Sequence, residues 1–291
     1  MKKRVAVIGK KGRLGAALCR DLTNEYDVFA LGRENVDLER PATDQLQGVE
    51  FDLLINTAAA TNVDWCENNR ATAHRINATS VGELGLLTAK RGIRMIHIST
   101  DYVFDGKSRR PYHETDPAHP ISAYGRTKKE GEDILLETSP DHLAIRVSWV
   151  FGPDKPSFVD SIIDRAINHS TAEAIADKFS APTYTLDFAA WLRPLLFEQP
   201  IGGLLHLCNG GECTWQEYGQ WAVDVAGKQG LELSAKEIKP ISLTSMKTFV
   251  AERPIYTVMD TSRFTAVTGI RPRPWREAVS DFVREKFRRQ T

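Results

Sequence analysis

The sequence has neither a long apolar run nor an excess of charge of one sign. Its 38 basic and 38 acidic residues leave a formal net charge of zero, so no net charge attracts the chain to nucleic acid or to an anionic membrane. No stretch approaches the roughly 20 apolar residues of a membrane-spanning helix. The apolar run after the basic N-terminus is interrupted by Gly9 and Lys10 and is too short for the core of a signal peptide. We therefore expect a cytoplasmic protein with no nucleic-acid and no membrane partner.

Cysteine is also scarce, and the few cysteines follow no ligand pattern. Cys19, Cys66, Cys208 and Cys213 form no CxxC pair and show no cysteine–histidine spacing typical of a zinc site. We expect reduced thiols and no bound metal.

Strand-like and helix-like segments alternate through the first half of the chain. Strands are expected over residues 5–8, 26–31, 52–56, 94–98 and 143–147, and one long helix over 63–90. Alternation of this kind is typical of an α/β fold, and apolar strands indicate a parallel sheet buried on both faces. The sequence predicts a Rossmann-like, doubly wound parallel sheet in residues 1–150, to which later segments return. Residues 151–291 are expected to form mainly a smaller C-terminal α/β substrate lobe.

The second half has a looser pattern. Helices are expected over residues 157–168, 186–197, 214–226 and 275–288, and short strands over 174–176, 204–207 and 236–238. These segments would supply the substrate lobe and the additional pieces of the sheet.

Three glycines mark the turn between the first strand and the first helix. In "VAVIGKKGRLG" they are Gly9, Gly12 and Gly15, a GxxGxxG spacing that also contains Arg13 and Leu14. A tight strand-to-helix turn needs residues without a Cβ, and a helix N-terminus presents free N–H groups to a pyrophosphate. The alternative is a glycine-rich turn that binds no ligand. The position of the turn at the first strand of an alternating chain favours dinucleotide binding.

The end of the second strand carries a base rather than an acid. Folds that prefer NADH usually place an acid there to bind the ribose hydroxyls, whereas this chain has Gly32 followed by Arg33. An arginine suits the 2′-phosphate of NADPH, so NADPH is the favoured cofactor and NADH the alternative. Asp37 and Leu38 are expected beside the adenine. The other interpretation of Arg33 is an ordinary surface arginine in a loop.

Tyr124 and Lys128 stand four residues apart in "SAYGRTKKEGE" (122–132) and so share one face of a helix. A lysine on an inward face needs a charge or a ligand, because burial of an unpaired ammonium is costly. Upstream, "ISTDYVFDG" places Ser99, Thr100 and Asp101 at the carboxyl end of a strand, where open α/β sheets bind ligands. We therefore expect a hydroxyl, a phenol and an ammonium to converge beside the cofactor.

Together these motifs resemble the extended short-chain dehydrogenase/reductase family over nearly the whole chain. The general motifs are the GxxGxxG turn, the strand-end Thr100 and the YxxxK pair of Tyr124 and Lys128. The longer matching stretches are NTAAATNVDWCE (56–67), INATSV (76–81), STDYVFDG (99–106), RVSWVFG (146–152), APTYTLDFA (181–189), CTWQEYG (213–219) and ERPIYTVMDTSRF (252–264). Within the family they are similar to nucleotide-sugar reductases. The resemblance implies NADPH-dependent reduction of a nucleotide-linked 4-keto-6-deoxy sugar such as dTDP-4-dehydro-L-rhamnose.

The resemblance also implies a role for each converging side chain. Tyr124 would be the general acid that protonates the C4 oxygen of the sugar, and Thr100 would hold the substrate carbonyl. Lys128 would bind the nicotinamide ribose and, as a cation, lower the pKa of Tyr124 from about 10 toward neutrality.

Further binding residues follow from the resemblance. They are Ala58, Ala59, Thr61 and Ser99 for the cofactor, and Val63, Asp101, Trp149 and Arg253 for the nucleotide sugar. Several of the site residues have simpler alternatives: Ser99 and Thr100 would cap a loop, Trp149 would be part of the core, and Arg253 would pair with a surface acid.

Two further features bear on partners and on function. Some relatives dimerise through a metal held by an acid of the first helix, but "GAALCRDL" offers no acid before Asp21, so no such metal is expected and a homodimer stays open. Two other functions are compatible with the same scaffold. One is a nucleotide-sugar epimerase, and the other is a non-catalytic, NADP-binding regulatory subunit.

Overall fold

A six-stranded parallel sheet forms the centre of the protein. The computed structural model describes residues 1–288. The strands of the sheet are β1 (Arg4–Ile8), β2 (Asp27–Leu31), β3 (Leu53–Asn56), β4 (Arg94–Thr100), β5 (Leu143–Val147) and β10 (Gly203–His206). They lie in the order β10-β5-β4-β3-β1-β2, and every neighbouring pair is parallel. The chain leaves β1 for one side of the sheet and returns for β3 on the other, so the topological switch point lies between β1 and β3.

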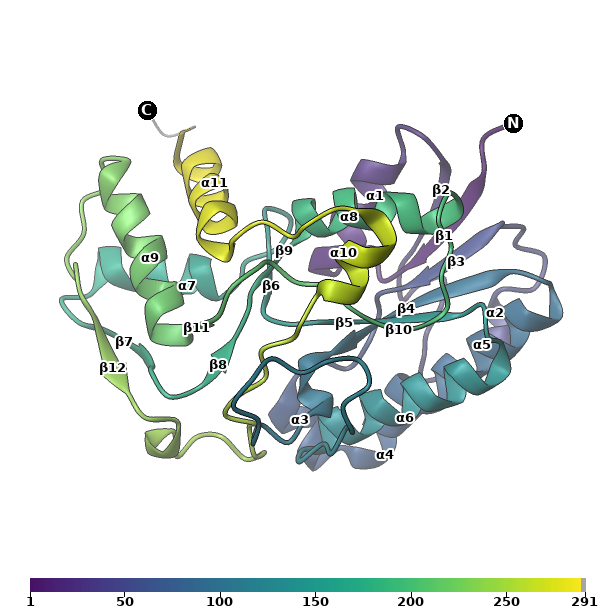
Figure 1. Cartoon of the computed structure of the whole chain (residues 1–291), viewed down its shortest axis with the longest axis horizontal. Coiled ribbons are helices and arrows are strands. Elements are labelled where there is room, and N and C mark those ends of the chain that lie inside the picture. The colour runs from purple at the N-terminus through teal and green to yellow at the C-terminus, as the bar shows by residue number, and fades with distance from the viewer. Residues whose placement is uncertain (289–291) are drawn as a thin grey trace.

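Helices cover both faces of this sheet (Figure 1). On one face α1 (Arg13–Leu22) and α8 (Thr185–Phe197) pack in one core cluster with alternate residues of the strands. On the other face α5 (Ser80–Lys90) and α6 (Ala123–Thr138) pack against the intervening residues, such as Leu54. The prediction of a doubly wound α/β fold is therefore confirmed.

The expected long helix over residues 63–90 is wrong, because the segment is interrupted. It consists of α3 (Val63–Asn68), α4 (Arg70–His74), a π-helical turn η1 (Arg75–Thr79) and α5. Asn69, with φ −128°, separates the first two pieces. Inside the π turn, Asn77 accepts the N–H of Ala60 at 2.8 Å and donates to the Ala60 carbonyl at 3.0 Å. The π-helical turn thus directs the buried side-chain amide of Asn77 toward the loop after β3, and π-bulges are often found at functional sites.

A second group of elements lies beside the sheet, on the left in Figure 1. It contains α7 (Phe158–Asn168), α9 (Trp215–Lys228) and α11 (Trp275–Phe287), with β7 (Ala172–Ile175) paired to β12 (Ile238–Ile241). These helices enclose a separate apolar core cluster. The expected helices of this half are all present, and its strands are displaced by one to three residues from the expected positions.

Several short elements had no signal in the sequence pattern. They are α2 (Ala42–Gln45), η2 (Asp101–Val103), β6 (Val150–Phe151), β8 (Phe179–Ser180), β9 (Thr183–Tyr184), β11 (Cys213–Thr214), η3 (Leu243–Ser245) and α10 (Ser262–Thr268). Most are two to four residues long, which is too short to show periodicity. Within residues 1–288, no helix has the length and apolar character needed to cross a membrane.

Candidate active site

A crevice of about 870 Å³ opens along the carboxyl ends of β1, β3, β4 and β5. Nearly all the residues expected to bind or react line it: Gly9, Gly12, Arg13, Leu14, Gly15, Arg33, Asp37, Leu38, Ala58, Ala59, Thr61, Val63, Ser99, Thr100, Asp101, Tyr124, Lys128 and Trp149. Arg253 does not belong to this lining. The structure thus brings together segments from the first 150 residues around one space.

The glycine turn forms one end of the crevice through backbone contacts. Gly9 has φ +98°, a conformation that L side chains rarely adopt. A Cβ on Gly15 would lie 2.1 Å from the carbonyl oxygen of Gly9, so the first turn of α1 can lie this close to the loop only with glycine at position 15. No side chain caps α1 at Gly12, and its first turn contains no acid. Its N-terminal N–H groups therefore face the crevice, as a diphosphate site requires.

Arg33 also lines the crevice, just after the end of β2 that hydrogen-bonds the glycine turn, and its side chain is held by acids. Its guanidinium donates to Glu39 and lies 3.5 Å from Asp37. The side chain is 70% exposed, so the two carboxylates orient it without burying it. The guanidinium of Arg33 can therefore leave one of these carboxylates and form an ion pair with a phosphate group instead.

Tyr124 reaches the crevice from the first turn of α6. Ser122 caps this helix by accepting the N–H of Gly125 at 3.2 Å. A Cβ on Gly125 would lie 2.1 Å from the carbonyl oxygen of Tyr102, so the glycine lets α6 approach the end of β4 closely. The ring of Tyr124 lies edge-on to that of Tyr102, at 5.6 Å between centroids.

The pKa of Tyr124 is raised, contrary to the expected lowering. Burial is the main cause, and the negative charge of Asp101 acts in the same direction, while a hydrogen bond with Thr100 opposes it. Lys128 does not offset this burial, because its ammonium group points toward the sheet. Lys128 Nζ donates to the carbonyl of Ile98 at 2.6 Å and lies 2.8 Å from Nε2 of His97. Burial lowers the pKa of Lys128 to about 7, against the opposing charge of Glu132.

Asp101 occupies a fully enclosed position beside Thr100. Its carboxylate accepts hydrogen bonds from Thr257 at 2.5 Å, from Ser180 at 3.1 Å and from Thr100 at 3.2 Å. Burial raises the pKa of Asp101, and the charge of Lys178 acts against that rise. Lys178 is itself buried, with its pKa lowered by burial to about 8. It donates to the Pro254 carbonyl at 2.7 Å and lies 4.9 Å from the Tyr102 ring centroid.

Two polar atoms at the wall of the crevice are buried without a partner. They are Oγ of Ser99 and Nε1 of Trp149. Trp149 is also the one non-glycine residue with positive φ, at 42°, within residues 1–288. Buried polar atoms in proteins are nearly always hydrogen-bonded, so both atoms are suited to a bound polar molecule. Together with the glycine turn, they fit a dinucleotide and its reaction partner.

Arg253 forms an ion pair near the crevice rather than lining it. Its guanidinium makes two hydrogen bonds to Asp64, at 2.8 and 2.6 Å, and stacks over the ring of Phe249. Asp64 also accepts the N–H groups of Val250 and Ala251. The bidentate bond from Arg253 is the main cause of the lowered pKa of Asp64, about 2. Val63 and Trp65, which flank Asp64 on α3, line the crevice, so the ion pair lies close to it. The role of Arg253 toward a nucleotide diphosphate stays a prediction.

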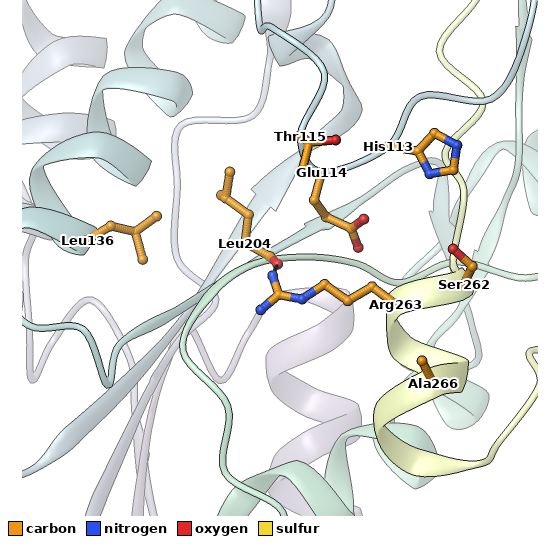
Figure 2. Close-up of a pocket in the computed structure, with 8 residues that line it drawn as sticks. All are labelled: His113, Glu114, Thr115, Leu136, Leu204, Ser262, Arg263 and Ala266. Carbon is orange, nitrogen blue, oxygen red and sulfur yellow. Dashed lines mark hydrogen bonds between the residues drawn. The ribbon is translucent and has the colours of Figure 1, made fainter.

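A second, shallower hollow lies away from this crevice, beside α10 (Figure 2). Its volume is about 680 Å³. Figure 2 shows Glu114 and Arg263 extending into the space between Leu136 and α10. Both are committed to backbone groups: Glu114 accepts the N–H of His206 at 2.9 Å, and Arg263 donates to the carbonyls of Leu204 and Gly202. These contacts hold the β10 edge of the sheet. In the described part of the chain, no three histidine, cysteine or acidic side chains are grouped as a metal site.

Sequence reasoning missed several polar residues behind the crevice. The buried residues that it missed, none of which belongs to the lining of the crevice, are Asn56, His97, Lys178, Ser180 and Thr257. A signal existed for the first two, because Asn56 and His97 interrupt the otherwise apolar strands "LLIN" and "RMIHI". Lys178 and Thr257 meet Asp101 only through contacts between distant segments.

The fold and this crevice define the protein as a member of the extended short-chain dehydrogenase/reductase class. More narrowly, the chain belongs to the RmlD substrate binding domain family, whose profile matches residues 3–287.

Individual relatives resemble the chain over almost its full length. The dTDP-4-dehydrorhamnose reductase of Burkholderia thailandensis is 33% identical, over 97% of this chain and 98% of the relative. A probable dTDP-4,6-dihydroxy-2-methyloxan-3-one 4-ketoreductase of Streptomyces antibioticus is 34% identical, over 94% of this chain and 92% of the relative. The crystal structure of dTDP-4-dehydrorhamnose reductase from Bacillus anthracis in complex with NADP has a TM-score of 0.90 and 28% identity. That alignment covers 98% of this chain and 100% of the other.

Proposed function

We propose that this protein is an NADPH-dependent reductase of a nucleotide-linked 4-keto-6-deoxy sugar. The first candidate substrate is dTDP-4-dehydro-L-rhamnose, reduced to dTDP-L-rhamnose. The proposal rests on the convergence of Thr100, Tyr124 and Lys128 in one crevice with the glycine turn. The two named relatives support the reaction class, because both names describe a reductase of a dTDP-linked compound. They differ in the sugar, so the choice of sugar is the finer part of the proposal.

The glycine-turn end of the crevice would bind the cofactor. The free N–H groups at the start of α1 would hold the diphosphate, and Arg33 would hold the 2′-phosphate that distinguishes NADPH from NADH. The NADP complex of the Bacillus anthracis protein supports this choice of cofactor. When bound, the reduced nicotinamide would supply a hydride to the carbonyl carbon.

Tyr124 would supply the proton that completes the reduction. Because burial raises its pKa, the phenol stays protonated at neutral pH, which is the form that can protonate the C4 oxygen. Thr100, next to it at the end of β4, would donate a hydrogen bond to the same oxygen. Asp101, Val63 and Trp149 would surround the sugar.

The test uses purified protein, NADPH and enzymatically generated dTDP-4-dehydro-L-rhamnose, with the absorbance of the reduced nicotinamide as the signal. We expect oxidation of NADPH in proportion to the sugar added. Replacing Tyr124→Phe should lower kcat by about 10²- to 10⁴-fold, the usual contribution of a general acid, and leave the affinity for NADPH within a few-fold. Tyr26→Phe is the matched control, because Tyr26 packs against Phe197 and the core cluster of α1 and α8 and does not line the crevice.

The contrary outcomes separate the parts of the proposal. Tight NADPH binding without oxidation would reject this sugar and direct the assay to other 4-keto sugars. An epimerase would convert its substrate without net consumption of NADPH. Full activity of the Tyr124→Phe variant would reject the assigned acid.

A further inference from the structure

A short loop from the second group of elements is fastened to α1. It consists of residues 153–156, between β6 and α7, with the sequence Pro-Asp-Lys-Pro. Nε of Arg13, the first residue of α1, donates to the carbonyl of Pro156 at 3.0 Å. One helical face further on, Arg20 forms an ion pair with Asp154. The loop therefore lies against the helix whose N-terminus faces the crevice.

The backbone of this loop has few alternative conformations. Pro153 and Pro156 fix their own φ angles, and each restricts the residue before it to extended backbone. A Cβ on Gly152 would clash with Oγ1 of Thr185, so the chain leaves β6 in close contact with the start of α8. At the other end, α7 begins with a capping box. Lys155, the residue before Pro156, is thus presented from a fixed position.

Lys155 also lines the crevice, and its charge is unpaired. The basic side chains of the lining are Lys11, Arg13, Arg33, Lys128 and Lys155. Acids pair with the first and third of these, and backbone carbonyls accept hydrogen bonds from the second and fourth. Within residues 1–288, Lys155 alone among them has neither a hydrogen-bond partner nor an ion-pair partner for its ammonium group.

A cofactor diphosphate at the glycine turn would need a cation in addition to backbone N–H groups. Such a group carries a negative charge on each phosphate, whereas the N-terminus of a helix supplies only about half a positive charge. The guanidinium of Arg13 already donates to the carbonyl of Pro156. Lys155 is the neighbour of Pro156 in the chain, so its unpaired ammonium is available beside the start of α1.

We propose that Lys155 binds the diphosphate of the cofactor, and that Arg20 is a positioning residue that holds the loop of Lys155 on α1. The inference rests on the cofactor site of the proposed function and adds to it a cation from the second half of the chain. The N–H groups of α1 and the ammonium of Lys155 would share the diphosphate. Part of the affinity for the cofactor would then come from residues beyond the glycine turn.

Fluorescence titration of the purified full-length protein with reduced cofactor tests this assignment without any sugar. Lys155→Ala should weaken the binding of NADPH about tenfold, because a charged hydrogen bond to a phosphate is lost. The binding of NADH should weaken by the same factor, since both cofactors contain the diphosphate. Added salt should weaken binding by the wild type more steeply than binding by the variant. Lys155→Arg keeps the charge and should bind within a few-fold of the wild type.

Lys239→Ala is the matched control for the loss of one positive charge. Lys239 is also exposed and also precedes a proline, but it lies on β12 and outside the lining of the crevice. Both affinities and their salt dependence should be unchanged in this variant.

A double-variant cycle tests the positioning role of Arg20. Arg20 does not line the crevice, so its effect on the cofactor must pass through the loop. Arg20→Ala should weaken the binding of both cofactors about two- to fivefold, as expected for loss of an exposed ion pair. In the Lys155→Ala background the same substitution should have no further effect. An equal loss in both backgrounds would show that Arg20 does not act through Lys155.

The remaining outcomes separate this inference from the proposed function. Unchanged affinity of Lys155→Ala for both cofactors would overturn the assignment. So would a loss for NADPH alone, which would place Lys155 at the 2′-phosphate. A raised KM for the nucleotide sugar with normal cofactor affinity would also overturn it, because Lys155 would then bind the other diphosphate. A wild-type protein that bound neither NADPH nor NADH would refute the proposed function as well, whereas the first three results leave that function standing.

Discussion

The two halves of the crevice are built by different means. The half proposed to bind the nucleotide, here the nucleotide half, comprises residues 9–15 and 57–61. It is shaped by backbone atoms in close approach, with Gly9 and Gly15 in contact. The half proposed to bind the substrate, here the substrate half, is lined by Asp101. Behind Asp101 lies a network of buried polar side chains from distant segments, namely Lys178, Ser180 and Thr257. One half therefore depends on shape and the other on charge. A single added methyl group should disrupt the first, whereas the second should respond to hydrogen bonds and pH.

The largest effect is expected from adding a methyl group to the nucleotide half. In Gly15→Ala the new Cβ would lie 2.1 Å from the Gly9 carbonyl oxygen, so α1 and the turn must separate. We expect NADPH affinity to fall roughly 100-fold and the free energy of unfolding to fall by about 1–3 kcal/mol. Fluorescence titration with NADPH and denaturant unfolding measure the two effects.

Gly48→Ala is the matched control for that substitution. Gly48 also has a positive φ, +76°, but open space surrounds it. It should lose about 1 kcal/mol of stability from its backbone conformation and bind NADPH normally. Normal binding by Gly15→Ala as well would contradict a nucleotide half that depends on close backbone contact.

A smaller effect, dependent on pH, is expected in the substrate half. Thr257→Val removes the 2.5 Å hydrogen bond to Asp101 with little change of volume. Because burial raises the pKa of Asp101, the folded state holds a proton that the unfolded state has released at pH values between the unfolded and the folded pKa. Stability contributed by this proton is present at acid pH and is lost as pH rises through the folded pKa. Loss of this hydrogen bond should lower the free energy of unfolding by about 1–3 kcal/mol at pH near 7 and by less at pH near 4.

Unfolding by urea at the two pH values measures that difference. Thr268→Val is the control, because Thr268 donates to the carbonyl of Phe264 and not to a carboxylate. Its loss of stability should be the same at both pH values. An equal loss for Thr257→Val would mean that the charge state of Asp101 in the folded protein does not change between the two pH values, and the substrate half would then not respond to pH through Asp101.

The smallest effect on stability is expected at the exposed edge of the nucleotide half. Arg33→Ala should change the free energy of unfolding by less than about 0.5 kcal/mol, as is usual for exposed side chains. Its preference for NADPH over NADH should fall about tenfold, because a charged hydrogen bond to the 2′-phosphate is lost. Arg40→Ala is the control: Arg40 also neighbours Asp37, at 3.8 Å, but lies outside the crevice lining. Equal preference in the wild type and in Arg33→Ala would assign the phosphate to another residue.

The nucleotide half could be predicted from the sequence because its signals are local. The glycines, the first strand and the start of α1 lie within a few residues of each other, and the strand-end rule then placed Ser99, Thr100 and Asp101. The continuous helix expected over 63–90 failed for a local reason as well, since Asn69 and the π turn break a pattern whose apolar spacing looks uninterrupted.

The substrate half could not be predicted in the same way. Thr257 and Asp101 are 156 residues apart in the chain, and no pattern in either segment indicates the other. The expected lowering of the Tyr124 pKa was wrong for a related reason, since burial raises this pKa. Whether Lys128 faces the phenol or His97 depends on how α6 lies on β4, which only the folded structure shows.

The backbone of Trp149 sets a lower limit on what its ring contributes. A tryptophan with φ 42° has a backbone strain energy of roughly 1–3 kcal/mol relative to a relaxed conformation. A glycine at that position would remove the strain. The ring packs edge-on against Trp215, at 5.6 Å between centroids, and is stacked with the ring of Tyr218 at 6.1 Å. Its contacts must therefore outweigh the strain, so a procedure that chose residues for this site by backbone preference alone would select glycine and lose both the wall of the crevice and its indole N–H.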